Sequence, residues 1–542
     1  MQKQLETLDY LVFIVYFLVV ATYGYWIYQR KKSQEESSTD FFLAEGSLTW
    51  WAIGASLIAS NISAEQFIGM SGNGFSMGLA ISTYEWMAAA TLLVVAIFFM
   101  PIYLKNRIFT MPQFLSQRYN PTVAMIMAIF WLFLYILVNL TSILYLGALA
   151  VNTISGINFT VCMISMAVFA VVITIGGMKV IGYTDVIQVF FLILGGLATT
   201  YLALNLVSEQ FGFGRDTMKG LGLIYEKSED HFHMIFQEGH PHYMSLPGLT
   251  VLLGGMWIVN LNYWGCNQYI TQRALGADLP TARSGLLFAA FLKLLMPVIV
   301  VLPGIAAYTL HQQGLFQTEM LKDGALSQDN AYPVLLNLLP TGLKGLSFAA
   351  LTAAVVASLA GKANSISTIF TLDIYRKYLN KNADEKQLVW TGRIAVVVAM
   401  VLAIVISPYM GIDKKGGFQF IQEMTGLVSP GVFAAFIMGF FWKRTNSAGA
   451  LFAIVGGFLM ALAMHNNVQI PFFAVDWSAI PFLDRMGIVF LVCVAVMIVL
   501  GLWKPSQKGL EIDASMFKVS GGFLAGAIVV VAIITFLYSY FW

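Results

Sequence analysis

Four polar side chains interrupt a long apolar stretch near the start of the chain. Residues 50–62 are apolar enough to lie in lipid, and the sequence then places Asn61, Ser63, Glu65 and Gln66 within NISAEQ. Several glycines follow and weaken a helix further. A bilayer tolerates irregular backbone only where protein encloses it around a cavity. Carbonyl groups freed at such a break can hold a small cation and neighbouring amides can hold a substrate, so the stretch predicts a binding site within a membrane.

Other polar residues also fall inside apolar runs. They are Glu85, Asn260, Lys293, Lys362 and Gln422, with Asp185 near the start of a run. An unpaired polar group there costs about 1–3 kcal/mol, and for any single one a hydrogen bond between helices accounts for its presence as well as a ligand does. As a set, amides with one carboxylate and one ammonium suit a neutral ligand with many hydroxyl groups, because hydroxyls both donate and accept.

Aromatic residues are interleaved with these polar positions. They are Tyr84, Trp86, Tyr135, Tyr263, Trp264 and Phe418. Aromatic rings suit stacking on the C–H face of a sugar, although packing accounts for aromatic residues at helical spacing as well.

The composition identifies the class of protein that must position these residues. Of the 542 residues 58% are hydrophobic and only 11% are charged, and the mean hydropathy is +0.75, well outside the range of a soluble domain. The net charge of +2 gives no indication of nucleic-acid binding. The three cysteines lack metal-binding spacing. The sequence therefore predicts an all-α polytopic membrane protein with one transmembrane domain over 1–542.

Apolar runs of about 20 residues mark the predicted spanning helices. Fourteen such runs lie at 8–28, 50–74, 78–104, 122–151, 158–177, 181–206, 245–271, 282–310, 334–372, 386–408, 417–441, 447–466, 479–502 and 517–541. Under this assignment basic residues gather in alternate loops, which include Arg30, Arg107, Arg118, Arg273, Arg283, Arg376 and Lys443. Basic loops are cytoplasmic, so both termini are predicted to lie outside the cytoplasm.

Two interrupted helices five helices apart predict an inverted repeat. The run at 248–270 has Asn260, Asn262 and Asn267 in its middle and end, much as the run at 50–74 is interrupted. We expect a first repeat over 50–206 and a second over 245–441, with the binding site between their broken first helices. The segments 1–49 and 442–542 are then peripheral.

The longest polar segment, 208–245, contains four histidines. They are His231, His233, His240 and His242. A zinc site is one reading, but the ligands lack evident tetrahedral spacing, so we expect a solvated external lid.

Eight longer motifs stand out in the chain: GASLIASNISAEQFIGMSG, STYEWM, LYILVNLTSILYLG, YTDVIQVFF, NLNYWGCNQYITQR, LPGIAAY, NSISTIFTLDIY and FQFIQEMTGLVSPG. These motifs resemble the solute:sodium symporter family, and the nearest branch looks like the bacterial sodium/galactose and animal sodium/glucose cotransporters. The resemblance runs from about residue 38 to 445. It implies a LeuT-like core of inverted five-helix repeats with extra flanking helices. For a bacterial member it also implies the inner, plasma membrane.

The resemblance also implies roles for particular residues. The substrate-binding residues would be Asn61, Gln66, Glu85, Asn260, Lys293 and Gln422. Met70, Tyr84 and Phe418 would close the outer side, Tyr263 and Trp264 the inner side, and Tyr135 would line the pocket. Sodium would be held by the backbone carbonyls of Ala59, Ile62 and Ala354 and by the hydroxyl of Ser358, with Asp185 on the inner path of the ion.

Three positions depart from the family pattern. Ala88 stands where the bacterial galactose transporters have a serine among the sugar contacts, and Ala357 replaces one of two adjacent serines at the cation site. Lys362 stands where the pattern is apolar, four residues beyond Ser358 and so on the same helix face. One reading is that Lys362 snorkels to the cytoplasm or pairs with Asp185. The sharper reading is that its ammonium replaces sodium, which would make transport proton-coupled or uncoupled.

The sequence thus predicts a secondary active transporter that carries a monosaccharide, galactose or glucose, with sodium by alternating access. Alternatives are a symporter for another polyol such as inositol, a proton-coupled or uncoupled sugar transporter, and, in a different class, a transporter-like sensor or channel. No nucleophile–base pair, metal motif or phosphate loop stands out, so we expect neither an enzyme nor a cofactor. The expected partners are the sugar, the sodium ion and the lipid bilayer, without nucleic acid or an obligate protein partner.

Overall fold

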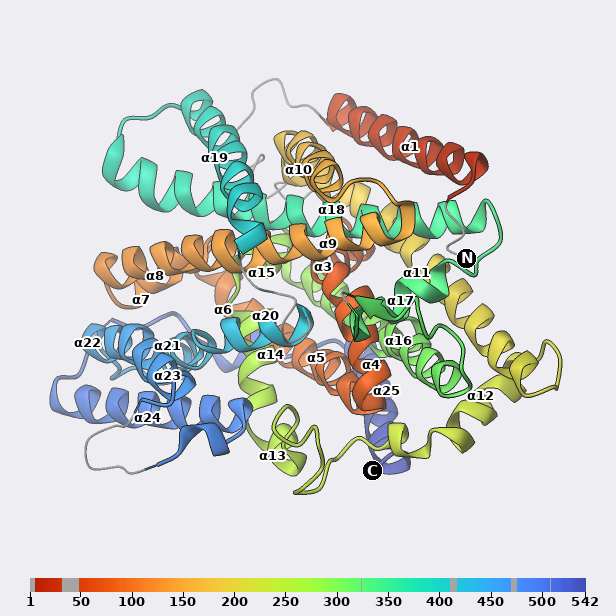
Figure 1. Ribbon diagram of the computed structural model, residues 1–542. Helices are drawn as coiled ribbons and strands as arrows, with labels where there is room; N and C mark the ends of the chain where they lie inside the picture. The colour runs from red at the N-terminus through yellow and green to blue at the C-terminus, as the bar shows by residue number, and fades with distance from the viewer. Residues whose placement is uncertain (1–4, 32–47, 323, 410–416, 469–474, 507) are drawn as a thin grey trace.

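The computed structural model describes residues 5–31, 48–322, 324–409, 417–468, 475–506 and 508–542, and this part of the chain is almost entirely helical (Figure 1). Ten helices in these ranges are long and apolar enough to cross a membrane, or eleven when one bent pair counts as a single span. The chain is therefore a polytopic helical membrane protein, as its composition predicts. The fourteen predicted runs exceed this number because those at 50–74, 158–177 and 245–271 contain helices shorter than a full span, such as α3 with 12 residues.

The helices follow one another with few long connections. The first half contains α1 (Thr7–Lys31), α3 (Trp50–Asn61), α4 (Ser71–Met77), α5 (Thr83–Val94), α6 (Met100–Lys105), α7 (Met111–Arg118), α8 (Pro121–Leu134), α9 (Thr141–Ser155), α10 (Phe159–Ile175), α11 (Gly177–Gln210) and α12 (Thr217–Lys227). The second half contains α13 (Gly248–Leu253), α14 (Gly255–Gly265), α15 (Gln268–Leu275), α16 (Leu279–Gln312), α17 (Ala331–Leu336), α18 (Leu343–Thr368), α19 (Glu385–Ile406), α20 (Gly417–Gly426), α21 (Ser429–Phe441), α22 (Ser447–Leu451), α23 (Gly457–His465), α24 (Phe482–Trp503) and α25 (Gly521–Tyr540).

Shorter turns continue or join these helices. The wider, π-type turns are η2 (Glu65–Met70), η4 (Val95–Phe99), η5 (Tyr135–Leu140), η8 (Ile369–Leu379) and η11 (Phe452–Gly456), and the tighter ones are η3 (Gly78–Ser82), η6 (Glu229–Phe232), η7 (Gln328–Asn330), η9 (Ser407–Tyr409), η12 (Trp477–Ala479) and η13 (Ala514–Phe517). Among the described residues, strand structure is limited to a short antiparallel hairpin of β1 (Leu321–Lys322) and β2 (Ala325–Leu326).

The first broken helix is interrupted at the predicted polar residues. Helix α3 ends at Asn61, and Ile62 is extended (φ −77°, ψ 117°) before η2 resumes at Glu65. The Ser63 N–H donates to Gln66 Oε1 (3.0 Å), whereas in a continuous helix it would donate to the carbonyl of Ala59. The side chain of Gln66 thus ends α3, and the last carbonyls of α3 remain available for other partners.

The second polar run is divided twice. Helices α13 and α14 are separated at Gly254, and α14 ends at Gly265, with Cys266 and Asn267 between it and the start of α15 at Gln268. A further bend of 52° separates α20 from α21. The sequence predicted a single span at 417–441, and the bend places Gln422 on a short helix of its own.

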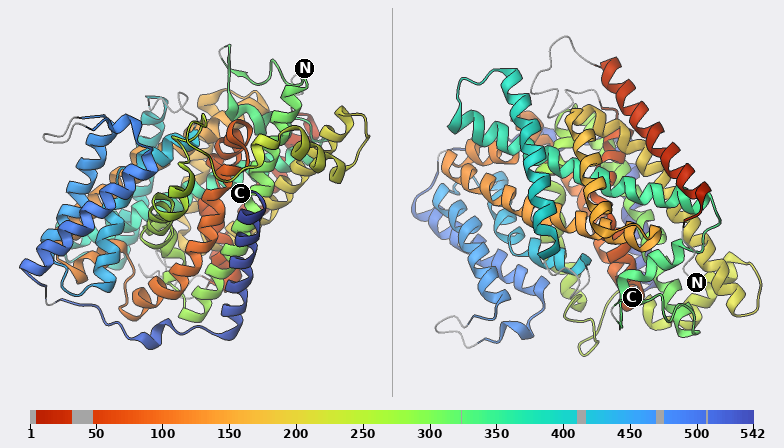
Figure 2. Two further views of the ribbon diagram at one scale, coloured as in Figure 1. Left: turned by 90° about the horizontal axis from the view of Figure 1, so that it is seen from below. Right: turned by 45° about the horizontal axis from the view of Figure 1, so that its top comes forward.

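Helix α16 lies at the centre of the fold and packs against α3, α4, α5 and α11. Glycines permit this close contact, because a Cβ at Gly54 would lie 2.8 Å from the carbonyl oxygen of Gly285, and a Cβ at Gly304 would overlap that of Ser71. Helix α18 packs against α11, α10 and α1. The group α21–α24 lies on the opposite side of the molecule from α1 (Figure 1, Figure 2).

Several arginines expected in cytoplasmic loops are buried instead. Arg118 is 1% exposed and donates to the carbonyls of Gly439 and Trp442, among others. Arg283 donates to the carbonyls of Ala96 and Lys518. A guanidinium has five N–H donors, so it can satisfy several carbonyls at once. Arg118 therefore binds the end of α21, and Arg283 connects η4 to the segment before α25.

The polar segment after α12 packs over the end of the molecule that holds the C-terminus (Figure 1). His231 bonds through Nε2 to the carbonyl of Phe75 (3.0 Å). The Met234 N–H donates to the carbonyl of Phe541 (2.8 Å). Among the described residues, no group of three or more histidine, cysteine or acidic side chains could hold a metal ion.

Candidate functional site

A buried charged pair lies where α16 meets the two helices that carry the first predicted site residues. Lys293 of α16 lies with its Nζ 2.5 Å from Glu85 Oε2 of α5, and it also donates to Asn61 Oδ1 at the end of α3. Lys293 is 1% exposed and Glu85 is 3% exposed. The Lys293 ammonium also faces the ring of Trp264 at 5.2 Å. A charge in such a place needs a partner, and this pair fixes three predicted substrate residues relative to one another.

Asn61 links this pair to an enclosed polar cavity. Its Nδ2 donates to the hydroxyl of Tyr263 (2.9 Å), and Tyr263 packs edge-on against Trp264. The residues that line the cavity include Asn61, Glu65, Gln66, Asn139, Asn262, Tyr263, Asn267, Tyr269, Gln422, Thr425 and Ser429. They come from α3, η2, η5, α14, α15, α20 and α21, so the cavity lies between the two interrupted segments and the bent helix. Its lining offers amides and hydroxyls that can both donate and accept.

Two predicted site residues contact other protein groups. Asn260 donates through Nδ2 to the carbonyl of Met256 (3.1 Å) on its own helix. Tyr135 donates to Asn267 Oδ1 and accepts from the Gln268 N–H (3.1 Å), so it holds the start of α15. Tyr135 reaches the cavity through Asn267, a residue that sequence reasoning did not assign to the site.

The predicted outer gate is closed by tight packing. Tyr84 of α5 and Phe418 of α20 meet edge-on with ring centroids 5.0 Å apart. Met70 and Phe418 are almost fully buried. A Cβ at Gly69 would lie only 2.8 Å from Phe418 Cβ, so η2 and α20 touch at this glycine.

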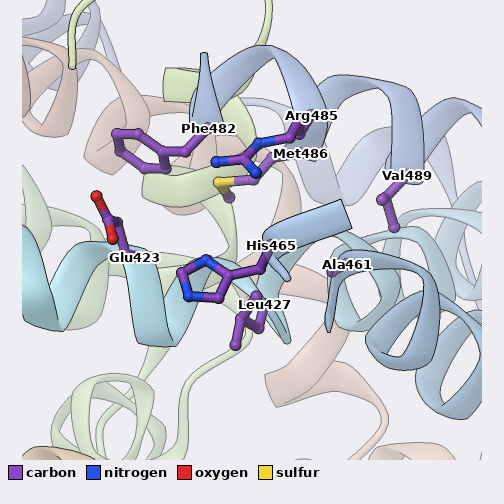
Figure 3. A pocket seen from close by; sticks show the side chains of 9 residues that line it. Glu423, Leu427, Ala461, His465, Phe482, Arg485, Met486 and Val489 are labelled. Atoms are coloured by element: carbon purple, nitrogen blue, oxygen red, sulfur yellow. The ribbon is translucent and has the colours of Figure 1, made fainter. Parts of the chain in front are cut away.

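Glu423, which follows Gln422 on α20, lines a second, smaller cavity (Figure 3). It lines this cavity together with Arg485 of α24 and His465 at the end of α23 (Figure 3). Glu423 accepts from Gln419 (3.1 Å), and Arg485 donates to the carbonyl of Met464 (2.9 Å). Helix α20 therefore presents Gln422 to the central cavity and Glu423 to α23 and α24. Sequence reasoning missed this second cavity, because nothing in the sequence brings 423, 465 and 485 together.

The predicted sodium residues lie on two helices in contact. Ala59 and Ile62 stand at the end of α3, and Ala354 and Ser358 stand on α18, which packs against α3. The hydroxyl of Ser358 donates to the carbonyl of Ser60 (3.0 Å). The end of α3 and this face of α18 therefore share a hydrogen bond, and all these residues are buried.

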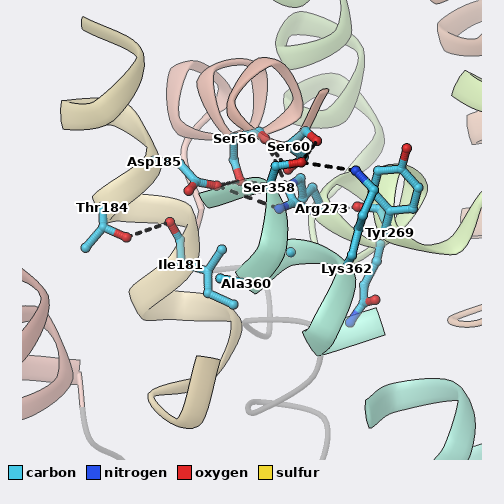
Figure 4. A network of polar contacts seen from close by, with 12 residues as sticks. Ser56, Ser60, Ile181, Thr184, Asp185, Tyr269, Arg273, Ser358, Ala360 and Lys362 are labelled. Atoms are coloured by element: carbon cyan, nitrogen blue, oxygen red, sulfur yellow. Dashed lines mark hydrogen bonds and ion pairs between the residues drawn. The ribbon is translucent and has the colours of Figure 1, made fainter. Parts of the chain in front are cut away.

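Lys362 is directed into this contact (Figure 4). Its Nζ donates to Ser358 Oγ (3.0 Å) and lies 4.5 Å from the ring centroid of Tyr269. The residue is 2% exposed, so it does not snorkel. The expectation that Lys362 pairs with Asp185 is also wrong, because the partners of Asp185 are the Ser56 hydroxyl (2.5 Å) and the Arg273 guanidinium (3.8 Å).

Arg273 is the residue of this network that sequence reasoning placed in a loop. Its Nε donates to the carbonyl and the hydroxyl of Ser56 (3.0 and 2.8 Å), and another of its nitrogens donates to the carbonyl of Tyr269 (Figure 4). A signal was available, since Arg273 stands five residues beyond Gln268 in a run of polar residues that continues the second interrupted helix. Arg273 thus connects α15 with α3 and α11.

Comparison with known proteins agrees with this geometry. The profile of the sodium:solute symporter family matches residues 41–457. A sodium/glucose cotransporter from Vibrio parahaemolyticus is 44% identical over 550 residues, which cover 99% of each chain. The human sodium/myo-inositol cotransporter 2 is 34% identical, over 85% of this chain and 70% of its own. The rabbit (Oryctolagus cuniculus) sodium/glucose cotransporter 1 is 31% identical, over 84% and 71%.

Solved structures support the same fold. A Na⁺-coupled sialic acid symporter in a substrate-bound outward-open state superposes with a TM-score of 0.78 at 21% identity, over 93% of this chain and 99% of its own. MHP1, a nucleobase-cation-symport-1 family transporter in a closed conformation, gives a TM-score of 0.52 at 13% identity, over 90% and 98%. With the interrupted helices, the enclosed polar cavity and the match over most of its length, this chain belongs to the sodium:solute symporter family.

Proposed function

We propose that this protein is a secondary active transporter that carries a monosaccharide together with sodium by alternating access. The observation that carries the proposal is the enclosed cavity lined by amides and hydroxyls beside the pair of Lys293 and Glu85. Such a lining suits a neutral polyhydroxylated ligand, because each sugar hydroxyl needs both a donor and an acceptor. The similarity to a sodium/glucose cotransporter over nearly the whole chain supports the same ligand class.

The sugar hydroxyls would bond to Asn61, Gln66 and Gln422, which line the cavity. Glu85 and Lys293 would act on the same ligand through Asn61, to which Lys293 is bonded. Asn260 and Tyr135 would then support the walls, since their hydrogen bonds go to protein groups. Tyr263 and Trp264 would stack on the ring from the inner side.

The cavity has a volume of about 50 Å³, room for a few water molecules. Binding of a sugar therefore requires α20 or the interrupted helices to move. Separation of Tyr84 from Phe418 would open the outer side. Sodium at Ala59, Ile62, Ala354 and Ser358 would favour that form, and coupling arises because each ligand binds best to a conformation that the other also favours.

The architecture we propose has fourteen spans, with inverted repeats over 50–206 and 245–441 and both termini outside the cytoplasm of a bacterial inner membrane. The eleven candidate spans and the three shorter apolar segments at 50–74, 158–177 and 245–271 together support this number. Sodium is a transported ligand in this proposal, and the chain needs no cofactor.

The test is uptake into proteoliposomes. Labelled galactose, glucose and myo-inositol are offered in parallel, with an inward sodium gradient or with choline in its place. We expect sodium-driven accumulation of a hexose, lost in Gln66→Ala and retained in Gln237→Ala, which changes an exposed glutamine of the external segment. Accumulation of myo-inositol alone would favour the second candidate, which the 34% identical relative suggests. Conductance without saturation would replace the symporter with a channel.

A further inference from the structure

The carbonyl end of α3 is a place that favours positive charge. The break after Asn61 leaves the Ala59 carbonyl without its usual Ser63 N–H, and the Ser60 carbonyl accepts from Ser358 of α18. Unpaired carbonyls at a helix C-terminus carry partial negative charge, equivalent to about half an elementary charge for the helix. The site is buried, so this charge is poorly screened.

Lys362 brings a full positive charge to this place. Its Nζ lies 3.0 Å from Ser358 Oγ, the same hydroxyl that donates to the Ser60 carbonyl, and the face of Tyr269 covers its other side (Figure 4). The Ser358 hydroxyl thus donates its proton to the Ser60 carbonyl of α3 and accepts a hydrogen bond from the Lys362 ammonium. Lys362 therefore contacts Ser358, the one side chain among the predicted sodium ligands, and already uses a lone pair of its hydroxyl oxygen.

The charged residues around Lys362 do not draw it away from Ser358. Asp185 on α11 is taken by Arg273 of α15 and by Ser56. Glu65 of η2 and Arg273 are the other charged groups that act electrostatically on Lys362. Glu65 is buried and its Oε1 has no hydrogen-bond partner among the described residues. Glu65 is therefore the acidic residue that acts on the charge of Lys362.

We propose that the Lys362 ammonium is a tethered cation that occupies the site of the transported sodium ion, so that the two exclude each other. Sodium can then bind only after Lys362 has withdrawn from Ser358. The inference rests on the proposed sodium-coupled function and adds a regulator of the same site. Two unit positive charges a few ångströms apart repel strongly wherever water does not screen them, so both cannot occupy the contact between α3 and α18.

Removal of the ammonium tests this exclusion. In Lys362→Met the side chain keeps similar length without charge, and the sodium concentration for half-saturation should fall about tenfold or more, equivalent to about 1.4 kcal/mol. Lys362→Arg keeps the charge and should stay close to the wild type. Lys344→Met is the matched control, since it removes the same charge from the first turn of the same helix.

The measurement is the sodium-dependent rise in melting temperature of the purified protein, with choline holding ionic strength constant and no sugar present. Because no sugar is needed, failure of hexose transport would overturn the proposed substrate and leave this result standing. An unchanged sodium midpoint in Lys362→Met, or an equal fall in Lys362→Arg or Lys344→Met, would overturn the inference. So would the absence of a sodium effect in every variant. Lys362→Gln, which is shorter and polar, repeats the test should the methionine variant fail to fold.

Discussion

Lys293 and Glu85 form a buried charged pair that stabilises the fold and also positions a proposed substrate-binding residue, Asn61. Each charge is nearly fully buried and each has the other as its main partner. Loss of one partner leaves the other buried and uncompensated, which costs about 3–5 kcal/mol, whereas loss of both is far less costly. The pair therefore holds α5 and α16 together while it positions Asn61.

This pair gives a first prediction. Glu85→Gln and Lys293→Met should each lower the melting temperature strongly, and the double variant should be more stable than the sum of the two losses predicts. Melting in detergent across the four proteins measures this coupling. Hexose uptake should be low in all three variants, because Lys293, which donates to Asn61, is either replaced or left without its carboxylate partner. Strictly additive losses would contradict the prediction.

Gly69 gives a second prediction at the residue scale. A methyl group there would meet Cβ and the backbone nitrogen of Phe418 at 2.8 and 2.9 Å, and a rotamer change cannot relieve contact with backbone. Gly69→Ala should therefore push the start of α20 outward and open the outer side. A cysteine at Gln419, beside this contact, should react faster with an impermeant maleimide in the Gly69→Ala background.

The matched control is Gly222→Ala, where a Cβ meets nothing within 4 Å. The reaction rate at Gln419→Cys should not change in that background. Equal acceleration by both substitutions would mean that loosening of the fold, and not the clash at Phe418, exposes the cysteine.

At the scale of elements, the polar segment between α12 and α13 holds two histidines, His240 and His242, whose pKa values are lowered. The ring of His240 stacks on Phe236 with centroids 4.0 Å apart. Burial lowers the pKa of both His240 and His242 below the ordinary value of about 6.5. A base with a lowered pKa stabilises the folded segment above its ordinary pKa, and this contribution is lost as the pH falls through the folded pKa, because the unfolded form then binds more protons.

A third prediction follows for this segment. Amide exchange of residues 236–243, corrected for intrinsic rates, should rise between about pH 7.5 and about pH 5, as the histidines become charged. The double variant His240→Phe, His242→Phe keeps ring packing without titration and should lose most of this pH dependence. The same pH dependence in the double variant would assign the effect to other groups.

The elements also show what the sequence could and could not predict. The break after Asn61 was predicted because polar residues beside glycines are costly in a lipid-exposed helix, and the structure confirms it. Arg118, Arg273 and Arg283 were predicted in loops, and the structure shows that they are buried, because hydropathy treats every arginine near a span end as solvated. Each guanidinium bonds to backbone carbonyls of other segments, and only the fold shows which segments come together.

The sequence indicated which residue types could bind the substrate, but it did not predict the contacts that each of these residues makes. Asn61, Gln66 and Gln422 line the cavity, whereas the partners of Asn260 and Tyr135 depend on the local path of α14 and α15. Lys362 stood out in the sequence as a charge on an apolar helix. Its partner could not be deduced, since Asp185 was the nearest acid by family pattern and Arg273 already pairs with it.

For the whole molecule, hydropathy predicted the number of apolar segments better than the number of full-length helices. Four of the fourteen predicted runs, at 50–74, 158–177, 245–271 and 417–441, contain only short helices, and three of these supply residues to the cavity. A helix too short to span must find partners for its ends inside the protein. The segments that depart most from a simple span are therefore those that build the site.

The orientation of the whole chain gives the last prediction. Helix α25 follows the basic linker that contains Lys504 and Lys518 and ends near Trp542, whose carbonyl contacts His233 of the polar segment between α12 and α13. The positive-inside rule then places the linker in the cytoplasm and Trp542 outside. The three native cysteines are buried, so single introduced cysteines report on which side of the membrane each position lies.

In intact cells an impermeant maleimide should label Trp542→Cys, whereas Ser515→Cys in the linker should react only after permeabilisation. The reverse pattern would invert the chain and move the closed gate of Tyr84 and Phe418 to the cytoplasmic side. Labelling of both in intact cells would mean that α25 does not span the membrane.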